Sequence, residues 1–149
     1  MTTHQQGIPL NPHDRRPGHL ALRLKTVDTG HSIPGRLVVR DTDDSHVTIA
    51  GNDAVNVIGY IAPTPSHDST VDFATENELR IEFGSGVIVP LTLATGQTIV
   101  KGDLLGPAAH GMVKDAGADP DSDKITGQAE ESVTTSTLAT APILVRMRI

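Results

Sequence analysis

The stretch Thr95-Gly96-Gln97-Thr98-Ile99-Val100-Lys101-Gly102-Asp103-Leu104-Leu105 places short apolar pairs between glycines and single charged residues. Gly111-Met112-Val113-Lys114 and Ile125-Thr126-Gly127-Gln128-Ala129 continue the same pattern further along the chain. Strands that turn sharply at glycine and keep one face in water produce this pattern in small β-barrels. The stretch therefore predicts a β scaffold rather than a reaction centre.

Alternation of apolar and polar residues predicts further short strands around this stretch. The alternating apolar positions are Leu20, Leu22 and Leu24; Val47 and Ile49; Val55 and Val57; Leu79, Ile81 and Phe83; Val87, Val89 and Leu91. Phe83-Gly84-Ser85-Gly86-Val87 has the residues of a hairpin turn, and residues 143–149 alternate as a last strand. The predicted fold is mainly β, a small β-barrel or β-sandwich of β-tulip-like type, with an extended N-terminal arm and long loops.

A weak internal repeat relates two parts of the chain. Ile33-Pro34-Gly35-Arg36-Leu37-Val38 aligns with Val100-Lys101-Gly102-Asp103-Leu104-Leu105, and Val57-Ile58-Gly59-Tyr60 aligns with Ile125-Thr126-Gly127-Gln128 at nearly the same offset. Two anchors at one offset suggest a duplicated strand-loop-strand unit, with related halves at about 33–62 and 100–129. Chance agreement among glycine, valine and isoleucine in a β protein is the alternative.

The composition predicts one domain with an aliphatic core. The chain has 149 residues, no cysteine and no tryptophan, and its aromatic residues are Tyr60, Phe73 and Phe83. A monomer with so few aromatic side chains has a marginal core, so we expect burial between subunits. The first residues lack an apolar signal segment, and no run of about 18 apolar residues occurs. We therefore expect neither export by a standard signal peptide nor a membrane partner.

Charge is distributed unequally along the chain. The formal net charge is -6 and the pI is near 5.5, which argues against a nucleic-acid partner because phosphate binding needs a basic face. Residues 1–19 are predicted to form an extended basic arm, and residues 20–149 a single β domain. A basic arm docks readily on an acidic neighbour, the alternative being a frayed terminus. The candidate contact residues are Arg15, Arg16, Arg23 and Lys25.

Three patterns in the sequence have residue types used in catalytic or metal sites, but each lacks a feature that such a site requires. Asp119-Pro120-Asp121-Ser122-Asp123 has EF-hand spacing with Glu130 at the twelfth position, but Lys124 stands where that loop needs glycine. Ser66, His67 and Asp68 are residue types of a hydrolase triad, yet adjacent side chains point apart. The histidines are scattered, so a zinc site would have to be assembled from distant strands. We predict a non-enzymatic protein with no catalytic, cofactor or metal site, and calcium binding by the acidic loop stays an open alternative.

Several of these segments together resemble the decoration, or cement, proteins of tailed viruses. They are residues 96–105, the Gly111-Met112-Val113 step, Gly127-Gln128-Ala129 and the closing Ala141-Pro142-Ile143-Leu144-Val145-Arg146-Met147-Arg148-Ile149. The resemblance covers the C-terminal half well and extends loosely to Val57-Ile58-Gly59-Tyr60-Ile61-Ala62. It implies a β protein made in the host cytoplasm that lies on the outer surface of an icosahedral capsid. It further implies homotrimers that clamp neighbouring subunits of the major capsid protein.

The same glycine, isoleucine and lysine pattern in residues 96–105 also recurs in β-clip and hammerhead barrels. A ligand-binding or enzyme-associated barrel is therefore the main alternative, and a calcium-dependent spike or adhesion module is the third. On the decoration hypothesis, the four basic residues named above lie across the seams between coat subunits.

Overall fold

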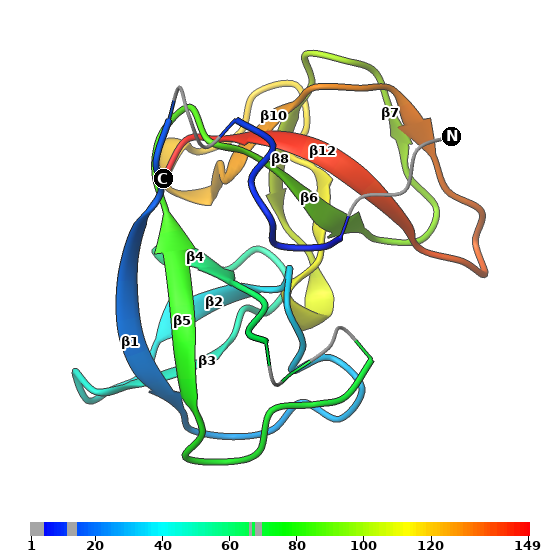
Figure 1. The fold of residues 1–149 in the computed structure, drawn as a ribbon. Helices are drawn as coiled ribbons and strands as arrows, with labels where there is room; N and C mark the ends of the chain where they lie inside the picture. The colour runs from blue at the N-terminus through cyan, green and yellow to red at the C-terminus, as the bar shows by residue number, and fades with distance from the viewer. Residues whose placement is uncertain (1–4, 12–14, 66, 68–69) are drawn as a thin grey trace.

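The computed structural model describes residues 5–11, 15–65, 67 and 70–149, and this part of the chain forms two small closed β-barrels (Figure 1). Barrel 1 contains β1 (Gly18–Leu24), β2 (Leu37–Arg40), β3 (His46–Ile49), β4 (Val57–Ile61) and β5 (Glu78–Phe83). Barrel 2 contains β6 (Ile88–Leu93), β8 (Leu104–Pro107), β9 (Val113–Asp115), β10 (Gly127–Ala129) and β12 (Ala141–Met147). The prediction of a mainly β fold built as a small barrel is confirmed.

The remaining elements are short. β7 (Thr98–Ile99) and β11 (Val133–Thr134) pair as a separate two-stranded sheet, and η1 (Ala109–Gly111) and η2 (Ser122–Lys124) are 3-10 turns. Among the described residues, no helix has the length and apolar character that crossing a bilayer requires.

The two barrels have the same strand order. It runs β1-β3-β2-β4-β5 in barrel 1 and β6-β9-β8-β10-β12 in barrel 2. In barrel 1, β1 pairs in parallel with β3 and antiparallel with β5. In barrel 2, β6 pairs in parallel with β9 and antiparallel with β12. Gly35 and Gly102 precede β2 and β8 with positive φ angles of 86° and 98°. Gly59 and Gly127 lie in β4 and β10. The glycines of the sequence repeat thus occupy equivalent positions in two five-stranded units.

Gly84, Ser85 and Gly86 connect the two barrels. β5 pairs with β1 and β4, whereas β6 pairs with β12 and β9, so the predicted hairpin across this turn is wrong. The Gly84 N–H donates to the Ile149 carbonyl at 2.7 Å, and the Gly86 N–H donates to the Met147 carbonyl at 2.9 Å. A glycine turn has the same local sequence whether its strands pair or diverge. Here the contacts with the end of the chain hold the turn in place.

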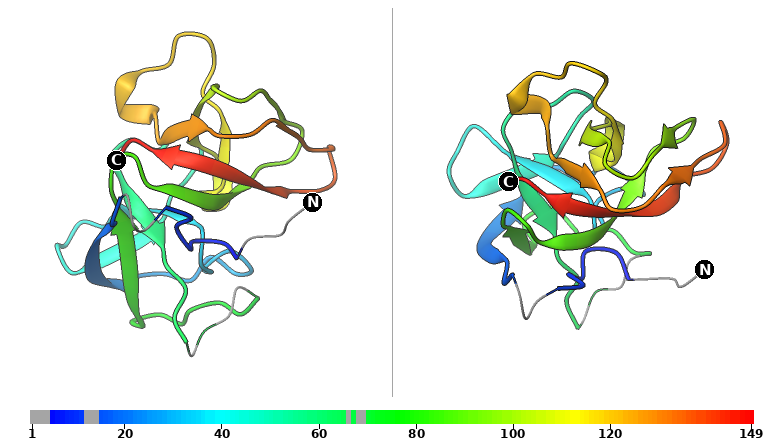
Figure 2. Two further views of the ribbon diagram at one scale, coloured as in Figure 1. Left: turned by 45° about the horizontal axis from the view of Figure 1, so that its top comes forward. Right: turned by 90° about the horizontal axis from the view of Figure 1, so that it is seen from above.

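Strands β2 and β4 have both faces buried. Val38 and Ile61 pack in the core of barrel 1, while their neighbours Leu37 and Tyr60 pack with the aliphatic side chains of barrel 2. Successive side chains of a strand point to opposite faces, so adjacent buried apolar residues mean that both faces are covered. One wall of barrel 1 therefore completes the larger core, and the barrels pack against each other in both views of Figure 2.

Candidate functional site

The four predicted contact residues lie along β1, and the structure divides them into two pairs. Arg15 and Arg16 precede the strand, whereas Arg23 lies near its end and Lys25 just beyond it; all four are exposed. A seven-residue strand spans about 20 Å. The Arg23 Nη1 atom is 4.0 Å from an oxygen of Glu76, and both side chains are more than half exposed. Neither pair is buried, so both stay available to a partner.

The described part of the N-terminal segment lies along β6 (Figure 1). The N–H groups of Gly7 and Leu10 donate to the carbonyls of Pro90 and Ile88 at 3.0 and 2.8 Å. The Asn11 side chain accepts from the Ile88 N–H at 2.8 Å and donates to the Gly86 carbonyl at 3.0 Å. Residues 7–11 therefore bind the chain's own second barrel and cover part of its β6 edge.

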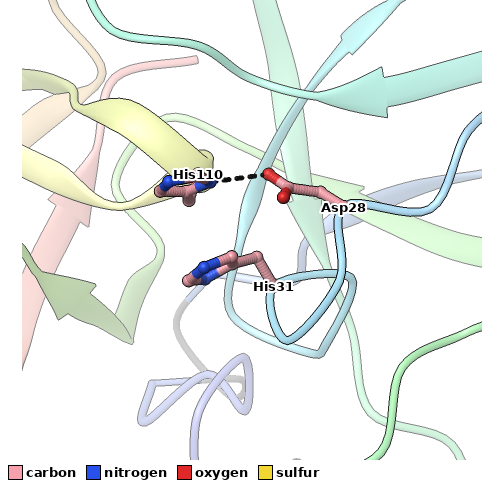
Figure 3. A group of neighbouring side chains, drawn as sticks. All are labelled: Asp28, His31 and His110. Carbon is pink, nitrogen blue, oxygen red and sulfur yellow. Dashed lines mark hydrogen bonds and ion pairs between the residues drawn. The ribbon is translucent and has the colours of Figure 1, made fainter.

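A polar group joins the two barrels, and we call it the inter-barrel cluster: Asp28, His31, Arg36, Asp72 and His110. Asp28, His31 and Arg36 come from the β1–β2 connection, Asp72 from the β4–β5 connection, and His110 from η1 of barrel 2. The Arg36 Nη1 donates to the His110 carbonyl at 2.9 Å and to the Nδ1 of His31 at 3.0 Å. The His110 Nδ1 lies 2.9 Å from a carboxylate oxygen of Asp28 (Figure 3).

Arg36 is the buried cation of the cluster. Arg36 is 7% exposed, and its Nε atom has no hydrogen-bond partner among the residues that the structure describes. Burial lowers the pKa of Arg36, and the carboxylates of Asp28 and Asp72 oppose that shift. Asp72 also accepts from the N–H groups of Gly30 and Ser32 at 2.7 and 3.0 Å, which orders the loop that carries His31. Two anchored carboxylates therefore compensate one buried guanidinium.

His31 and His110 stack on each other, with ring centroids 4.0 Å apart and an interplanar angle of 16° (Figure 3). Burial lowers the pKa of His31, and the neighbouring His110 and Arg36 lower it further. Since arginine can only donate, the Nδ1 of His31 must present its lone pair to Arg36. At neutral pH His31 is therefore a neutral imidazole that serves as a hydrogen-bond acceptor.

The same residues fit a metal ion poorly. Asp28, His31 and His110 each offer a ligand atom, and these atoms lie within 4.8 Å of one another. However, the Nδ1 of His31 already accepts from Arg36, which would place a guanidinium beside the ion. The lone pairs of parallel stacked rings also run side by side instead of converging on a tetrahedral centre. We assign no metal to this cluster.

The sequence contains no signal for this cluster. Arg36 lies in the repeat segment that begins at Ile33, but that repeat does not point to a polar cluster, and His31 and His110 are far apart along the chain. The two histidines meet only because η1 of barrel 2 lies against the connection that precedes β2. Such an arrangement depends on how the barrels pack, so no pattern of residue spacing in the sequence predicts it.

In the acidic loop, residues 119–123, lysine side chains lie close to the carboxylates, an arrangement that does not suit calcium. The Lys124 Nζ lies 3.7 Å from Asp121, and Lys114 lines the same hollow as Asp119. Glu130, which would close a calcium loop, lies 2.6 Å from the Nε of Arg146. Lys124 and Arg146 thus lie beside two of the carboxylates that a calcium loop would use as ligands. Of the triad candidates, Ser66 and Asp68 lie outside the described residues, and His67 stacks on Phe73.

A second histidine site lies in barrel 1. The His46 Nδ1 is 2.8 Å from an Asp43 oxygen, and its Nε2 is 2.9 Å from a Glu76 oxygen. A neutral imidazole has one N–H, so both bonds form fully only with the protonated ring. The hydrogen bonds to Glu76 and Asp43 raise the pKa of His46, while the bond from His46 lowers the pKa of Asp43.

We expect His46→Gln to destabilise the protein more in acid than in alkali. Because the pKa of His46 is raised in the fold, its contribution is fully present below the unfolded-state value of 6.5 and is lost as the pH rises through the folded-state pKa. Urea denaturation at about pH 5.5 and about pH 9 measures the effect on either side of this range. The exposed His19, changed to Gln, is the control. An equal effect of His46→Gln at both pH values would contradict the assignment.

Fold and contacts together define this chain as a tandem β-barrel protein with an N-terminal segment docked along one strand. No family model and no curated protein sequence matches it. A solved structure with a similar fold is the head fiber gp8.5 N base in bacteriophage phi29. The two superpose with a TM-score of 0.52 at 15% sequence identity, over 89% of this chain and 98% of that one. At this identity the similarity shows a shared fold.

Proposed function

We propose that this chain is a structural protein of a tailed-virus particle that binds the outer capsid surface and stabilises the shell by holding neighbouring coat subunits together. In this proposal it acts without catalysis, as a homotrimer, and its partner is the major capsid protein. The observation that carries the proposal is the fold shared with the base of a phage head fiber over nearly the whole length of both chains.

The docked N-terminal segment supplies a preformed contact surface. Ile8 and Leu10 are each 40% exposed beside β6, and the exposed Arg15 and Arg16 follow them in the chain. An apolar pair next to a basic pair is suited to a coat surface with acidic rims. Because residues 7–11 are already hydrogen-bonded to barrel 2, binding does not require ordering them at that moment. Many such contacts repeated over a closed shell add up by avidity.

Co-sedimentation with mature empty capsids of the parent virus tests the proposal. We expect saturable binding. The double variant Arg15→Glu with Arg16→Glu should weaken this binding about tenfold or more, because two exposed ion pairs with the coat surface are lost and replaced by charge repulsion. Arg23→Glu with Lys25→Glu tests the far end of β1 separately. Lys101→Glu with Arg148→Glu, an equal charge change at exposed residues of barrel 2, is the matched control.

Three results would contradict the proposal or one of its parts. Absence of binding to fully expanded capsids would favour a free-standing ligand-binding barrel instead. A monomer in light scattering at micromolar concentration would contradict the trimer. Binding that persists in high salt would argue against the basic pairs, because exposed charges are screened within about 8 Å at physiological ionic strength.

A further inference from the structure

The η1 turn of barrel 2 rests on barrel 1 through both main-chain and side-chain bonds. The Gly111 N–H donates to the Ala50 carbonyl at 2.8 Å, and the Asp53 N–H donates to the Pro107 carbonyl at 3.0 Å. His110 itself has a left-handed φ of 60°, which a non-glycine residue keeps only when its surroundings hold it there. The inter-barrel cluster provides that hold through Arg36 and Asp28.

We propose that the inter-barrel cluster is a pH-sensitive latch, which fastens η1 of barrel 2 to barrel 1 at neutral pH and releases it in mild acid when His31 takes up a proton. This goes beyond a role on a capsid, since it describes the coupling of the two barrels whatever surface they bind.

Protonation of His31 reverses the hydrogen bond that closes the cluster. The Nδ1 that accepts from Arg36 becomes an N–H donor, so two donors face each other across 3.0 Å. The same Arg36 Nη1 also holds the His110 carbonyl, and its displacement therefore frees the η1 turn. The reversal thus acts directly on the bond that joins the barrels.

On balance the surroundings of the His31 ring oppose its protonation. Four titratable or charged groups influence His31: Arg36 before β2, His110 on η1, Asp28 on the same connection and Asp72 on the β4–β5 connection. Both carboxylates already have partners, because Asp28 binds His110 and Asp72 accepts from Gly30 and Ser32. The two carboxylates still raise the pKa of His31, but burial and the neighbouring His110 and Arg36 outweigh them, so a charged His31 is disfavoured beside the guanidinium.

The direction of the effect follows from burial. Since the pKa of His31 is lowered in the folded protein, its contribution to stability is present above the unfolded-state value of 6.5 and is lost as the pH falls from there through the folded-state pKa. The pKa of His46 is raised, so its contribution to stability changes with pH in the opposite direction. The test is therefore made with a variant that lacks this histidine. The core shared by the barrels, which includes Leu37 and Val89, is built mostly of aliphatic side chains, so we expect the barrels to stay folded when the latch opens.

Amide hydrogen exchange of the full chain carrying His46→Gln tests the latch. Corrected for the intrinsic rate, protection of the Gly111 and Asp53 amides should fall about fivefold from about pH 8 to about pH 5.5, the factor that one net hydrogen bond represents. The amides of Ala62 and Ala116, bonded within barrel 1 and barrel 2 respectively, should keep their protection and serve as internal controls.

Two variants at position 31 separate the latch from a merely structural contact. In His31→Asn the side-chain oxygen takes the position of Nδ1 and accepts from Arg36 at every pH, so protection of Gly111 should stay high at both pH values. In His31→Leu it should be low at both, with circular dichroism confirming the fold. The latch is overturned if Gly111 protection in the parent is independent of pH, or if His31→Asn keeps the pH dependence. It is also overturned if added Zn²⁺ raises the protection and a chelator removes it.

Discussion

Replacing Gly59 by alanine is expected to lower the free energy of unfolding by about 3 kcal/mol, because the new methyl group has no space in a closed barrel. A Cβ at this position would overlap the main-chain oxygen of Glu82 on the neighbouring strand β5 and lie 3.0 Å from the Ile81 side chain. A main-chain oxygen held in a ladder cannot turn aside as a flexible side chain can. Urea denaturation measures the loss.

Gly51→Ala is the matched control, since a Cβ there meets nothing within 4 Å. We expect its stability to change by no more than about 1 kcal/mol, in the stabilising direction, because alanine restricts the unfolded chain. Gly127→Ala probes the equivalent site of barrel 2, where the Cβ would lie 2.6 Å from the Arg146 carbonyl oxygen. Equal stabilities of the Gly59 and Gly51 variants would show that β4 moves away from β5 without cost.

Leu37→Ala is expected to cost about 2–5 kcal/mol and to destabilise both barrels together. Leu37 belongs to β2 of barrel 1, but its side chain is fully buried in the core of barrel 2. Truncation therefore leaves a cavity at the wall that the barrels share. Leu138→Ala is the control, because this side chain is 93% exposed and should change stability by less than about 0.5 kcal/mol.

The cooperativity of unfolding distinguishes a shared core from two independent ones. If the wall couples the barrels, Leu37→Ala shifts a single transition seen alike by Tyr60 fluorescence and by circular dichroism. Two separate transitions, with only one of them moved, would show that each barrel unfolds alone and that the shared wall contributes little.

The repeated strand order explains why one glycine pattern occurs twice. Gly59 and Gly127 each allow a strand to approach its neighbour, Glu82 on β5 in one barrel and Arg146 on β12 in the other. The alternating apolar residues predicted most strands because alternation reports which face of a strand is buried. It did not predict which strands pair, and the turn at residues 84–86 therefore looked like a hairpin while it connects two barrels.

The sequence by itself determined that the chain is mainly β, where most strands run, and that the basic residues Arg15, Arg16, Arg23 and Lys25 gather near its beginning. These features are local, since alternation and charge are visible within a few residues. Only the tertiary structure decided that β1 separates the basic residues into two pairs, and that the N-terminal segment docks on β6.

The inter-barrel cluster shows the same limit most clearly. His31 and His110 acquire their stacking, and Arg36 its burial, from the packing of one barrel on the other. Contacts between residues so distant in the chain depend on the closure of both barrels and on the apolar wall of β2 and β4 between them. No short pattern encodes that arrangement, because the free energy that creates it comes from burial across the whole interface.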